Sequence, residues 1–360
     1  MKKKLVHVGA AIILVVLLLV LILFVMFFQE IRTLSSVKTL NDKDMYQMTY
    51  YGNYYFDEFL ASGGAQSEEE IKDFFEKKFT KGLPINLDDR NPACSTYMAH
   101  NTNGDVIFGR NFDFSYTPIV VVQTHPKGGY ASVSVADLAF IGYTKDSIPK
   151  KDGIALKKIY MLMAPYFSED GMNEKGVAIS MMTVPDADNP YIEGAPYLTT
   201  TAIVRLVLDK AANVDEAIEL IRGSNIYWWS NIKNHFMISD ATGRSVVVEY
   251  KNKELVIIEQ DTDYQISTNY NFYDGLRRGS GQDRYDTIEK TLLEKDGVLN
   301  EADALEVLKK VGIPGRIQWS ALYNLTTGDV CVFPRGDIDT LERFQLTVTH
   351  DMNGRINDAD

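Results

Sequence analysis

The stretch Cys94–Phe114, CSTYMAHNTNGDVIFGRNFDF, decides how the chain is interpreted. It begins with one of the two cysteines in 360 residues. Two runs typical of strands flank Asn103–Gly104, a dipeptide that favours the tight turn of a β-hairpin. The second run ends in Arg-Asn-Phe-Asp, so Arg110 and Asp113 lie on the strand that pairs with the cysteine strand. The sequence therefore predicts a hairpin carrying a thiol, a guanidinium and a carboxylate.

Two interpretations of Cys94 are open. A lone cysteine is most often a small buried hydrophobe, and Cys331, in the apolar run DVCVF, fits that description. The alternative is cleavage between Ala93 and Cys94, which gives one residue a thiol nucleophile and a free α-amine. Such an amine, with an ordinary pKa of about 7.7–8.0, can act as the general base. Arg110 would then favour the thiolate and Asp113 would orient the amine, whereas the alternative for these two residues is a surface ion pair.

The hairpin resembles the first hairpin of the choloylglycine hydrolase family. These are N-terminal-nucleophile amidases that include conjugated bile acid hydrolases and penicillin V acylases, and they are related to acid ceramidase and N-acylethanolamine acid amidase. Five later segments resemble the family in the same order: DGMNEKGVAISMMTVP, FMISDATGRSVVVEY, ISTNYNF, GQDRYD and IQWSALYNLTTGDVCVF. The resemblance covers 94–333. It implies an α+β fold, the four-layer αββα sandwich, with two antiparallel sheets between helical layers.

The resemblance also implies roles for individual residues. Cys94 attacks the amide carbonyl, and its own amine carries the proton to the leaving group. Asn269 and a backbone N–H stabilise the oxyanion. Asp113 positions the amine, and Arg110 and Arg284 set the charge around it. This machinery requires no cofactor, and no motif in the chain has the spacing of a metal site.

Two features bear on specificity. Thr183 stands where bile acid hydrolases of this family carry an asparagine, and a hydroxyl cannot offer the same two-donor amide. This departure puts bile-salt specificity in doubt but leaves the chemistry in place. Trp228 and Trp229, in NIYWWSNIKN, are candidates either for an acyl pocket or for the core.

The N-terminus predicts a membrane anchor. Lys2–Lys4 precede the run Leu5–Phe28, whose only ionisable side chain is His7. At about 1.5 Å per residue, 9–28 alone spans roughly the 30 Å hydrocarbon core of a bilayer. The run ends in bulky residues with no small-x-small site, which favours an uncleaved signal anchor over a cleaved signal peptide or a buried soluble helix. We therefore expect a single-pass cell-membrane protein with its catalytic domain on the extracytoplasmic side.

The expected organisation has three parts: an anchor over 1–30, a polar stalk and helical pro-segment over 31–93, and an amidase domain over 94–360. Met45–Leu60, whose tyrosines recur every fourth residue, is predicted as an aromatic helix. Ser67 and Glu70 form a capping box before a second helix. Four helices are predicted in the amidase domain, over 198–211, 214–222, 283–294 and 301–310.

The charge of the chain excludes one class of partner. A net charge of -12 and a pI of about 5.0 argue against nucleic-acid binding. The expected partner is a small-molecule amide, with lipid-like N-acyl amides placed ahead of conjugated bile acids and penicillins because of the anchor and the aromatic pro-segment. An acyltransferase that passes the acyl group to an amine, and a non-catalytic binding protein, remain open as other classes. The sequence indicates no oligomeric state.

Overall fold

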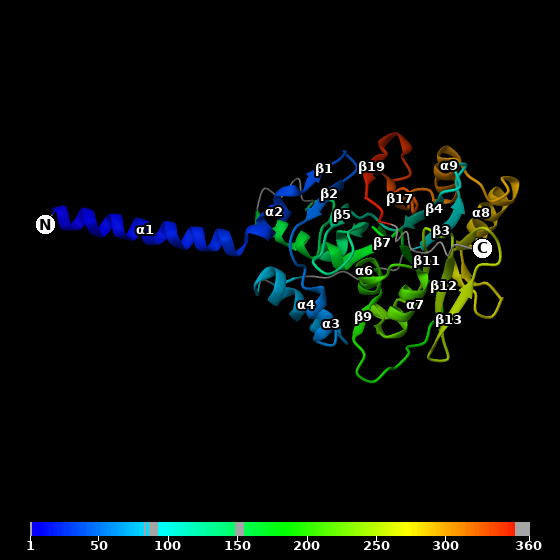
Figure 1. The fold of residues 1–360 in the computed structure, drawn as a ribbon, viewed down its shortest axis with the longest axis horizontal. Coiled ribbons are helices and arrows are strands. Elements are labelled where there is room, and N and C mark those ends of the chain that lie inside the picture. The colour runs from blue at the N-terminus through cyan, green and yellow to red at the C-terminus, as the bar shows by residue number, and fades with distance from the viewer. Residues whose placement is uncertain (1, 83, 86–92, 148–154, 350–360) are drawn as a thin grey trace, which may run out of the picture.

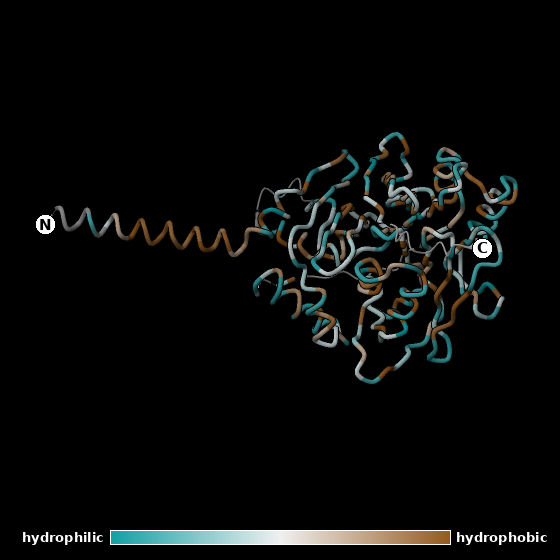
Figure 2. Tube along the Cα trace, in the orientation of Figure 1, coloured by the Kyte–Doolittle hydropathy of each residue, from teal (hydrophilic) through white to brown (hydrophobic). Residues whose placement is uncertain are grey.

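The apolar N-terminal helix stands away from the folded body. The computed structural model describes residues 2–82, 84–85, 93–147 and 155–349. Helix α1 (Lys2–Met26) projects from the body, and most of its length is hydrophobic (Figures 1 and 2). Its window Gly9–Met26 has a mean hydropathy of 3.4 and is unburied; among the described residues it alone is long and apolar enough to cross a membrane. By length and composition, α1 is a candidate membrane span or signal sequence.

The larger of the two main sheets has nine strands in the order β1-β2-β5-β6-β7-β8-β11-β12-β13. Neighbouring strands are antiparallel, except that β2 and β5 run parallel. The strands are β1 (Lys38–Thr39), β2 (Met45–Tyr50), β5 (Ile119–Thr124), β6 (Ser132–Asp137), β7 (Ser168–Asn173), β8 (Ala178–Thr183), β11 (Asn234–Ser239), β12 (Ser245–Lys251) and β13 (Glu254–Glu259).

The smaller main sheet has six antiparallel strands in the order β14-β3-β4-β17-β18-β19. The strands are β14 (Gln265–Ser267), β3 (Ala93–His100), β4 (Val106–Asp113), β17 (Ile317–Asn324), β18 (Asp329–Pro334) and β19 (Glu342–Gln345). The predicted hairpin is confirmed, because β3 and β4 pair directly with Cys94 opposite Phe112. Its turn holds Gly104 at φ +84°, a backbone conformation that glycine adopts without steric cost.

Helices cover the outer faces of the two sheets. A buried core that includes Cys94, Phe112 and Trp319 lies between the sheets. Helices α6 (Thr200–Lys210) and α7 (Val214–Arg222) contact the larger sheet, and α8 (Gln282–Glu294) and α9 (Glu301–Val311) contact the smaller one. A separate apolar cluster lies under each helical layer (Figure 1). The chain is therefore a mixed α/β sandwich, and the four helices predicted for the amidase domain are confirmed.

Shorter elements connect these layers. Two strand pairs stand outside the main sheets: β9 (Tyr197–Thr199) with β10 (Asn225–Tyr227), and β15 (Asn269–Asn271) with β16 (Arg278–Ser280). The remaining short helices and helical turns of the amidase domain are η2 (Ala139–Ile141), α5 (Ala155–Lys158), η3 (Ile159–Phe167), η4 (Trp229–Asn231) and η5 (Ile338–Thr340).

The helix predicted over Met45–Leu60 is wrong. The segment forms strand β2, a turn, and then a short helix, α3 (Phe56–Ala61). Tyr46, Met48 and Tyr50 alternate along β2 and pack into the apolar cluster under α6, whereas Met45 packs between the sheets. The period of two is present in the sequence, since Tyr46, Met48 and Tyr50 alternate with the polar Gln47 and Thr49, but tyrosines four residues apart also fit one face of a helix.

The segment expected as stalk and pro-segment contains several ordered elements. Residues 31–36, expected as part of a polar stalk, are helical and belong to α2 (Phe28–Ser36). Thr33 is fully buried, and its hydroxyl accepts the Tyr51 N–H at 2.9 Å. The second predicted helix is confirmed as α4 (Glu68–Phe75), where the Ser67 hydroxyl accepts the Glu70 N–H at 3.2 Å. It runs on into a π-helical turn, η1 (Glu76–Thr80).

Candidate active site

Cys94 lies enclosed near the start of β3. Its side chain is fully buried in the core between the sheets, on the same face as Phe112 opposite. Burial raises the pKa of the Cys94 thiol to about 11, and the nearby Arg110 guanidinium only partly opposes that shift. Residues 86–92, which precede the expected cleavage site, lie outside the described part of the chain. In this state the thiol is shielded from solvent and its protonated form is favoured.

Two side chains from distant elements hold the backbone of Cys94. Its N–H donates to Asn269 Oδ1 at 2.7 Å, and Arg284 Nη2 donates to the same oxygen at 2.8 Å. Arg284 Nη1 also donates to the Cys94 carbonyl oxygen. The Asn269 amide nitrogen donates to the Thr183 carbonyl oxygen at 2.8 Å. The structure thus brings together three of the predicted site residues, from β3, β15 and α8.

Asp113 lies at the end of β4, opposite Ala93. Its Oδ1 accepts the Ile313 N–H at 2.9 Å, and its Oδ2 lies 3.6 Å from Arg284 Nη1. Burial raises the pKa of Asp113 to about 6, against the lowering effects of the Ile313 N–H and the nearby arginines. The carboxyl group therefore lies beside the expected cleavage site, with a pKa close to neutrality.

Arg110 is also fully buried, so the alternative of a surface ion pair between Arg110 and Asp113 is wrong. Its Nε lies 3.6 Å from Oδ2 of Asp170, in β7. Asp170 accepts the Trp319 indole N–H at 2.9 Å and the Tyr323 hydroxyl. Sequence reasoning did not select Asp170 as a site residue. The feature that could have marked Asp170 is a pair of adjacent carboxyl groups, Glu169 and Asp170, in a strand that lies at the centre of a sheet.

A buried histidine supports the strand that carries Asn269. His235 Nε2 lies 2.9 Å from the Thr268 carbonyl oxygen, and His235 Nδ1 lies 2.9 Å from Glu249 Oε1. Glu249 in turn accepts the backbone N–H groups of Phe272 and Tyr273. Sequence reasoning had left the five histidines without a constellation. His235 fixes the backbone next to Asn269 and does not approach Cys94 through any described hydrogen bond.

The three residues considered for substrate specificity, Thr183, Trp228 and Trp229, lie in different surroundings. The Thr183 hydroxyl is buried and, within the described part of the chain, has no hydrogen-bond partner. Trp228 is buried and packs edge-on against Tyr250, with ring centroids 5.7 Å apart. Trp229 instead lines a pocket. The structure thus assigns one tryptophan to the core and the other to a pocket.

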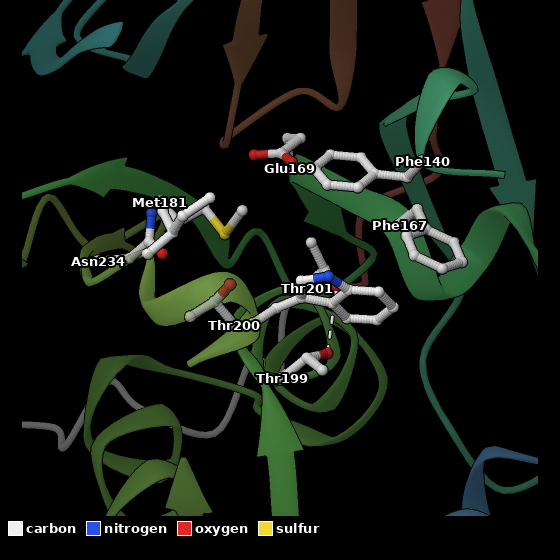
Figure 3. Close-up of a pocket in the computed structure, with 10 residues that line it drawn as sticks. Phe140, Phe167, Glu169, Met181, Thr199, Thr200, Thr201 and Asn234 are labelled. Atoms are coloured by element: carbon white, nitrogen blue, oxygen red, sulfur yellow. Dashed lines mark hydrogen bonds between the residues drawn. The ribbon is translucent and has the colours of Figure 1, made fainter. Parts of the chain in front are cut away.

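Figure 3 shows the residues that line this pocket. Its apolar walls include Phe140, Phe167 and Trp229, and Thr199–Thr201 supply hydroxyls. Glu169 also lines the pocket, and its carboxyl interacts electrostatically with Cys94 and Arg110. Asn234, a further lining residue, pairs with Thr183 across β11 and β8. Two lining residues therefore connect the pocket to the site, Glu169 through its charge and Asn234 through its pairing with Thr183. Within the described ranges, no cluster of three or more His, Cys, Asp or Glu side chains could hold a metal ion.

Residues 94–317 match the pattern of linear amide C–N hydrolases of the choloylglycine hydrolase family. The chain belongs to this family. The matched region begins at Cys94 and covers more than half of the chain. It includes the hairpin, Thr183, Asn269 and Arg284.

Relatives of the choloylglycine hydrolase type resemble the chain over part of their length. A bile salt hydrolase/transferase of Clostridium perfringens is 26% identical over 207 residues, covering 51% of this chain and 58% of the relative. A penicillin V acylase of Pectobacterium atrosepticum is 29% identical over 116 residues, covering 29% of this chain and 31% of the relative. The crystal structure of a mutant conjugated bile acid hydrolase from C. perfringens superposes with a TM-score of 0.51 at 16% identity. That superposition covers 70% of this chain and 92% of the hydrolase and supports the sandwich fold.

Proposed function

We propose that this chain is a cysteine N-terminal-nucleophile hydrolase that cleaves linear amide bonds through an acyl-Cys94 intermediate. The observation that carries the proposal is the pair of side chains on the Cys94 backbone. Asn269 and Arg284 meet at the atoms that become the α-amine and its neighbouring carbonyl after cleavage. A structural cysteine in a core strand needs no such pair.

Maturation is the first step of the proposed mechanism. The Cys94 thiol attacks the Ala93 carbonyl carbon, the Ala93–Cys94 C–N bond breaks, and the α-nitrogen leaves with a proton. Water then hydrolyses the resulting thioester, which frees the Ala93 carboxylate and regenerates the thiol. Asp113, opposite Ala93, receives the new ammonium group. That nearby positive charge lowers the thiol pKa from its value in the uncut chain.

Substrate hydrolysis repeats this chemistry on an external amide. The thiolate attacks the carbonyl carbon, and the second N–H of the Asn269 amide and the Thr183 hydroxyl are the donors we assign to the oxyanion. The amine of Cys94 passes a proton to the leaving amine, and water then releases the acyl group. One oxyanion donor of this kind is worth about 3 kcal/mol.

We favour lipid-like N-acyl amides as substrates of a membrane-anchored enzyme. The support is the apolar α1, which is followed at once by α2 with its buried Thr33, and a pocket with aromatic walls that includes Glu169. The extracytoplasmic side follows from Lys2–Lys4 before the span. Conjugated bile acids and penicillins are the alternatives. Extraction of membranes with alkaline carbonate tests the anchor: release of the protein, or a mature N-terminus just after α1, contradicts it.

A second candidate function is acyl transfer to an amine. The C. perfringens relative carries the name hydrolase/transferase, and an acyl-cysteine serves both outcomes equally. Product analysis with an added amine acceptor separates the two. A non-catalytic binding protein is disfavoured by the buried, mutually bonded set of Cys94, Asn269 and Arg284.

The deciding experiment is N-terminal sequencing with intact mass of the purified full-length protein. We expect a fragment beginning Cys-Ser-Thr-Tyr, its absence in Cys94→Ala, and an acyl adduct on Cys94 during amide turnover. An uncut wild-type chain that nevertheless hydrolyses amides, or a Cys94→Ala protein that retains activity, would reject the mechanism.

A further inference from the structure

Glu169 is the buried acid that the proposed mechanism does not use. Its side chain has no solvent exposure, and neither carboxyl oxygen has a hydrogen-bond partner in the described part of the chain. Most buried carboxyl groups are paired, because loss of hydration without compensation costs free energy. A carboxyl group in this state has both oxygens available to an incoming hydrogen-bond donor.

The backbone turns Glu169 toward the site. In the pairing of β6 with β7, Val135 lies opposite Asp170 and Ala136 lies opposite Ser168, so Glu169 is the extra residue of a β-bulge. A bulge re-aims a side chain that regular alternation would place on the other face, and bulges are frequent beside active sites. Glu169 lines the pocket, near Phe140 and Phe167 in Figure 3.

One cation, Arg110, is shared between Glu169 and other carboxyl groups. Arg110, Asp137 and Asp170 are the charged groups nearest to Glu169. Arg110 already lies 3.6 Å from Asp170. Burial raises the pKa of Glu169 well above its ordinary range, more than Arg110 lowers it. This corner therefore has a surplus of acid, and an incoming positive charge would favour the ionised carboxylate.

The opposite walls suit an organic cation. Phe140 and Phe167 stack with ring centroids 5.8 Å apart, and Trp229 supplies a third aromatic ring. Aromatic faces attract ammonium groups, most strongly where water is excluded. Thr199–Thr201 add hydroxyl oxygens that can accept further N–H groups.

We propose that this pocket is a specificity subsite for an alkylammonium group, and that Glu169 selects amide substrates carrying a primary amine on an apolar chain. The inference rests on the proposed amidase function, which it narrows to amine-bearing amides. Glu169 acts in recognition: the ammonium donates hydrogen bonds to its carboxylate, and the methylene chain lies along the aromatic walls.

Isosteric substrate pairs test the proposal. On the acyl side, ε-aminocaproyl is compared with heptanoyl, and γ-aminobutyryl with pentanoyl, as para-nitroanilides. On the amine side, octanoyl amides of cadaverine are compared with those of hexylamine. We expect the ammonium member of at least one pair to be favoured in kcat/KM by about tenfold or more, the ratio that one charge-assisted hydrogen bond supplies.

Two variants test whether Glu169 causes the preference for ammonium substrates. Glu169→Gln should reduce the ratio of the ammonium to the methyl-terminated rate by about tenfold. Glu254→Gln, on the exposed strand β13, removes a charge elsewhere and should keep the wild-type ratio. A ratio of one or less for every pair overturns the inference. Equal slowing of both members in Glu169→Gln also overturns it, because that outcome indicates proton transfer or structural support.

A binding measurement separates this inference from the proposed function. Hexylammonium, but not hexanol, should raise the Tm of the inactive Cys94→Ala protein, and Glu169→Gln should abolish the shift in that background. If the shift occurs and no amide is hydrolysed, the subsite stands and the amidase proposal fails. If amides are hydrolysed without ammonium preference and hexylammonium gives no shift, the subsite is refuted while the amidase proposal stands.

Discussion

The backbone N–H of Cys94 donates to the side-chain oxygen of Asn269 at 2.7 Å, across 175 positions of sequence. This bond ties the expected cleavage site in β3 to β15, outside the two main sheets. It also orients the Asn269 amide, because an oxygen that accepts from Cys94 and Arg284 leaves the nitrogen to donate to Thr183. The amide that we propose as the oxyanion donor is thus already oriented in the uncut chain.

Asn269→Ala should lower kcat by about 10²–10³-fold with a small effect on KM, since the donor acts on charge that develops in the transition state. Asn271→Ala is the matched control. It lies on the same strand, donates to Asp186 and makes no described contact with Cys94. Steady-state kinetics on a soluble amide compares the two. Similar kcat losses in both variants would mean that strand β15, rather than the amide, is responsible.

Gly281→Ala should disrupt the position of Arg284. Gly281 has φ +89°, and an added Cβ would lie 2.5 Å from Arg284 Nη2. Gly275→Ala carries a comparable backbone cost at φ +69° but has open space around its Cβ. Both variants should lose about 1 kcal/mol of stability, but Gly281→Ala alone should slow cleavage and turnover. Equal activity in the two variants would remove Arg284 from the mechanism.

Asp113 should give the rate profile of the matured enzyme an acidic limb below pH 6. Burial raises its pKa to about 6 in the uncut chain, and the new ammonium group lowers that pKa, so the ionised carboxylate that holds the amine appears at a lower pH. The stability effect has the opposite sign. The contribution from protonated Asp113 is complete below the ordinary pKa and is lost as pH rises through about 6.

Asp113→Asn checks both effects. The variant should have a much lower kcat/KM than the wild type, and its profile of kcat/KM against pH should lack the acidic limb. Its Tm relative to wild type should improve between pH 4 and pH 7, because the variant has no carboxyl to ionise. An unchanged limb in the variant would assign the titration to another group.

His235→Ala should destabilise the protein by about 2–4 kcal/mol, because Glu249 loses a buried partner. It should also lower kcat more than it raises KM, because the Thr268 backbone next to Asn269 loses its support. Urea unfolding and kinetics measure the two effects, and His235→Gln should recover part of the kcat. A stability loss without any change in kcat would limit His235 to a structural role.

Local patterns predicted the hairpin but not the whole site. The Asn-Gly turn fixed the pairing of β3 with β4, and hence the neighbourhood of Cys94, Arg110 and Asp113. Asn269 and Arg284 were found through family resemblance, because nothing near them in sequence marks their approach to Cys94. The acid at Glu169 was not selected, since its bulge depends on the register between β6 and β7, which is set by contacts distant in sequence.

The segment Met45–Leu60 shows the limit of periodicity in a different way. In β2 the buried Tyr46, Met48 and Tyr50 alternate with the polar, half-buried Gln47 and Thr49, but tyrosines four residues apart fit one face of a helix equally well. The amphipathic helix α4 was predicted correctly because its cap and its apolar face are local features. A local capping signal therefore decided an assignment that residue spacing alone leaves ambiguous.

The parallel pairing of β2 with β5 has a consequence for the life of the enzyme after the proposed cleavage. The two fragments would share one sheet, and departure of the N-terminal piece would bare the β5 edge along Ile119–Thr124. An apolar, unpaired strand edge is a template for pairing with other chains. Fragment loss would thus create a seed for aggregation, so ageing of the matured enzyme should appear as irreversible precipitation that speeds up with protein concentration.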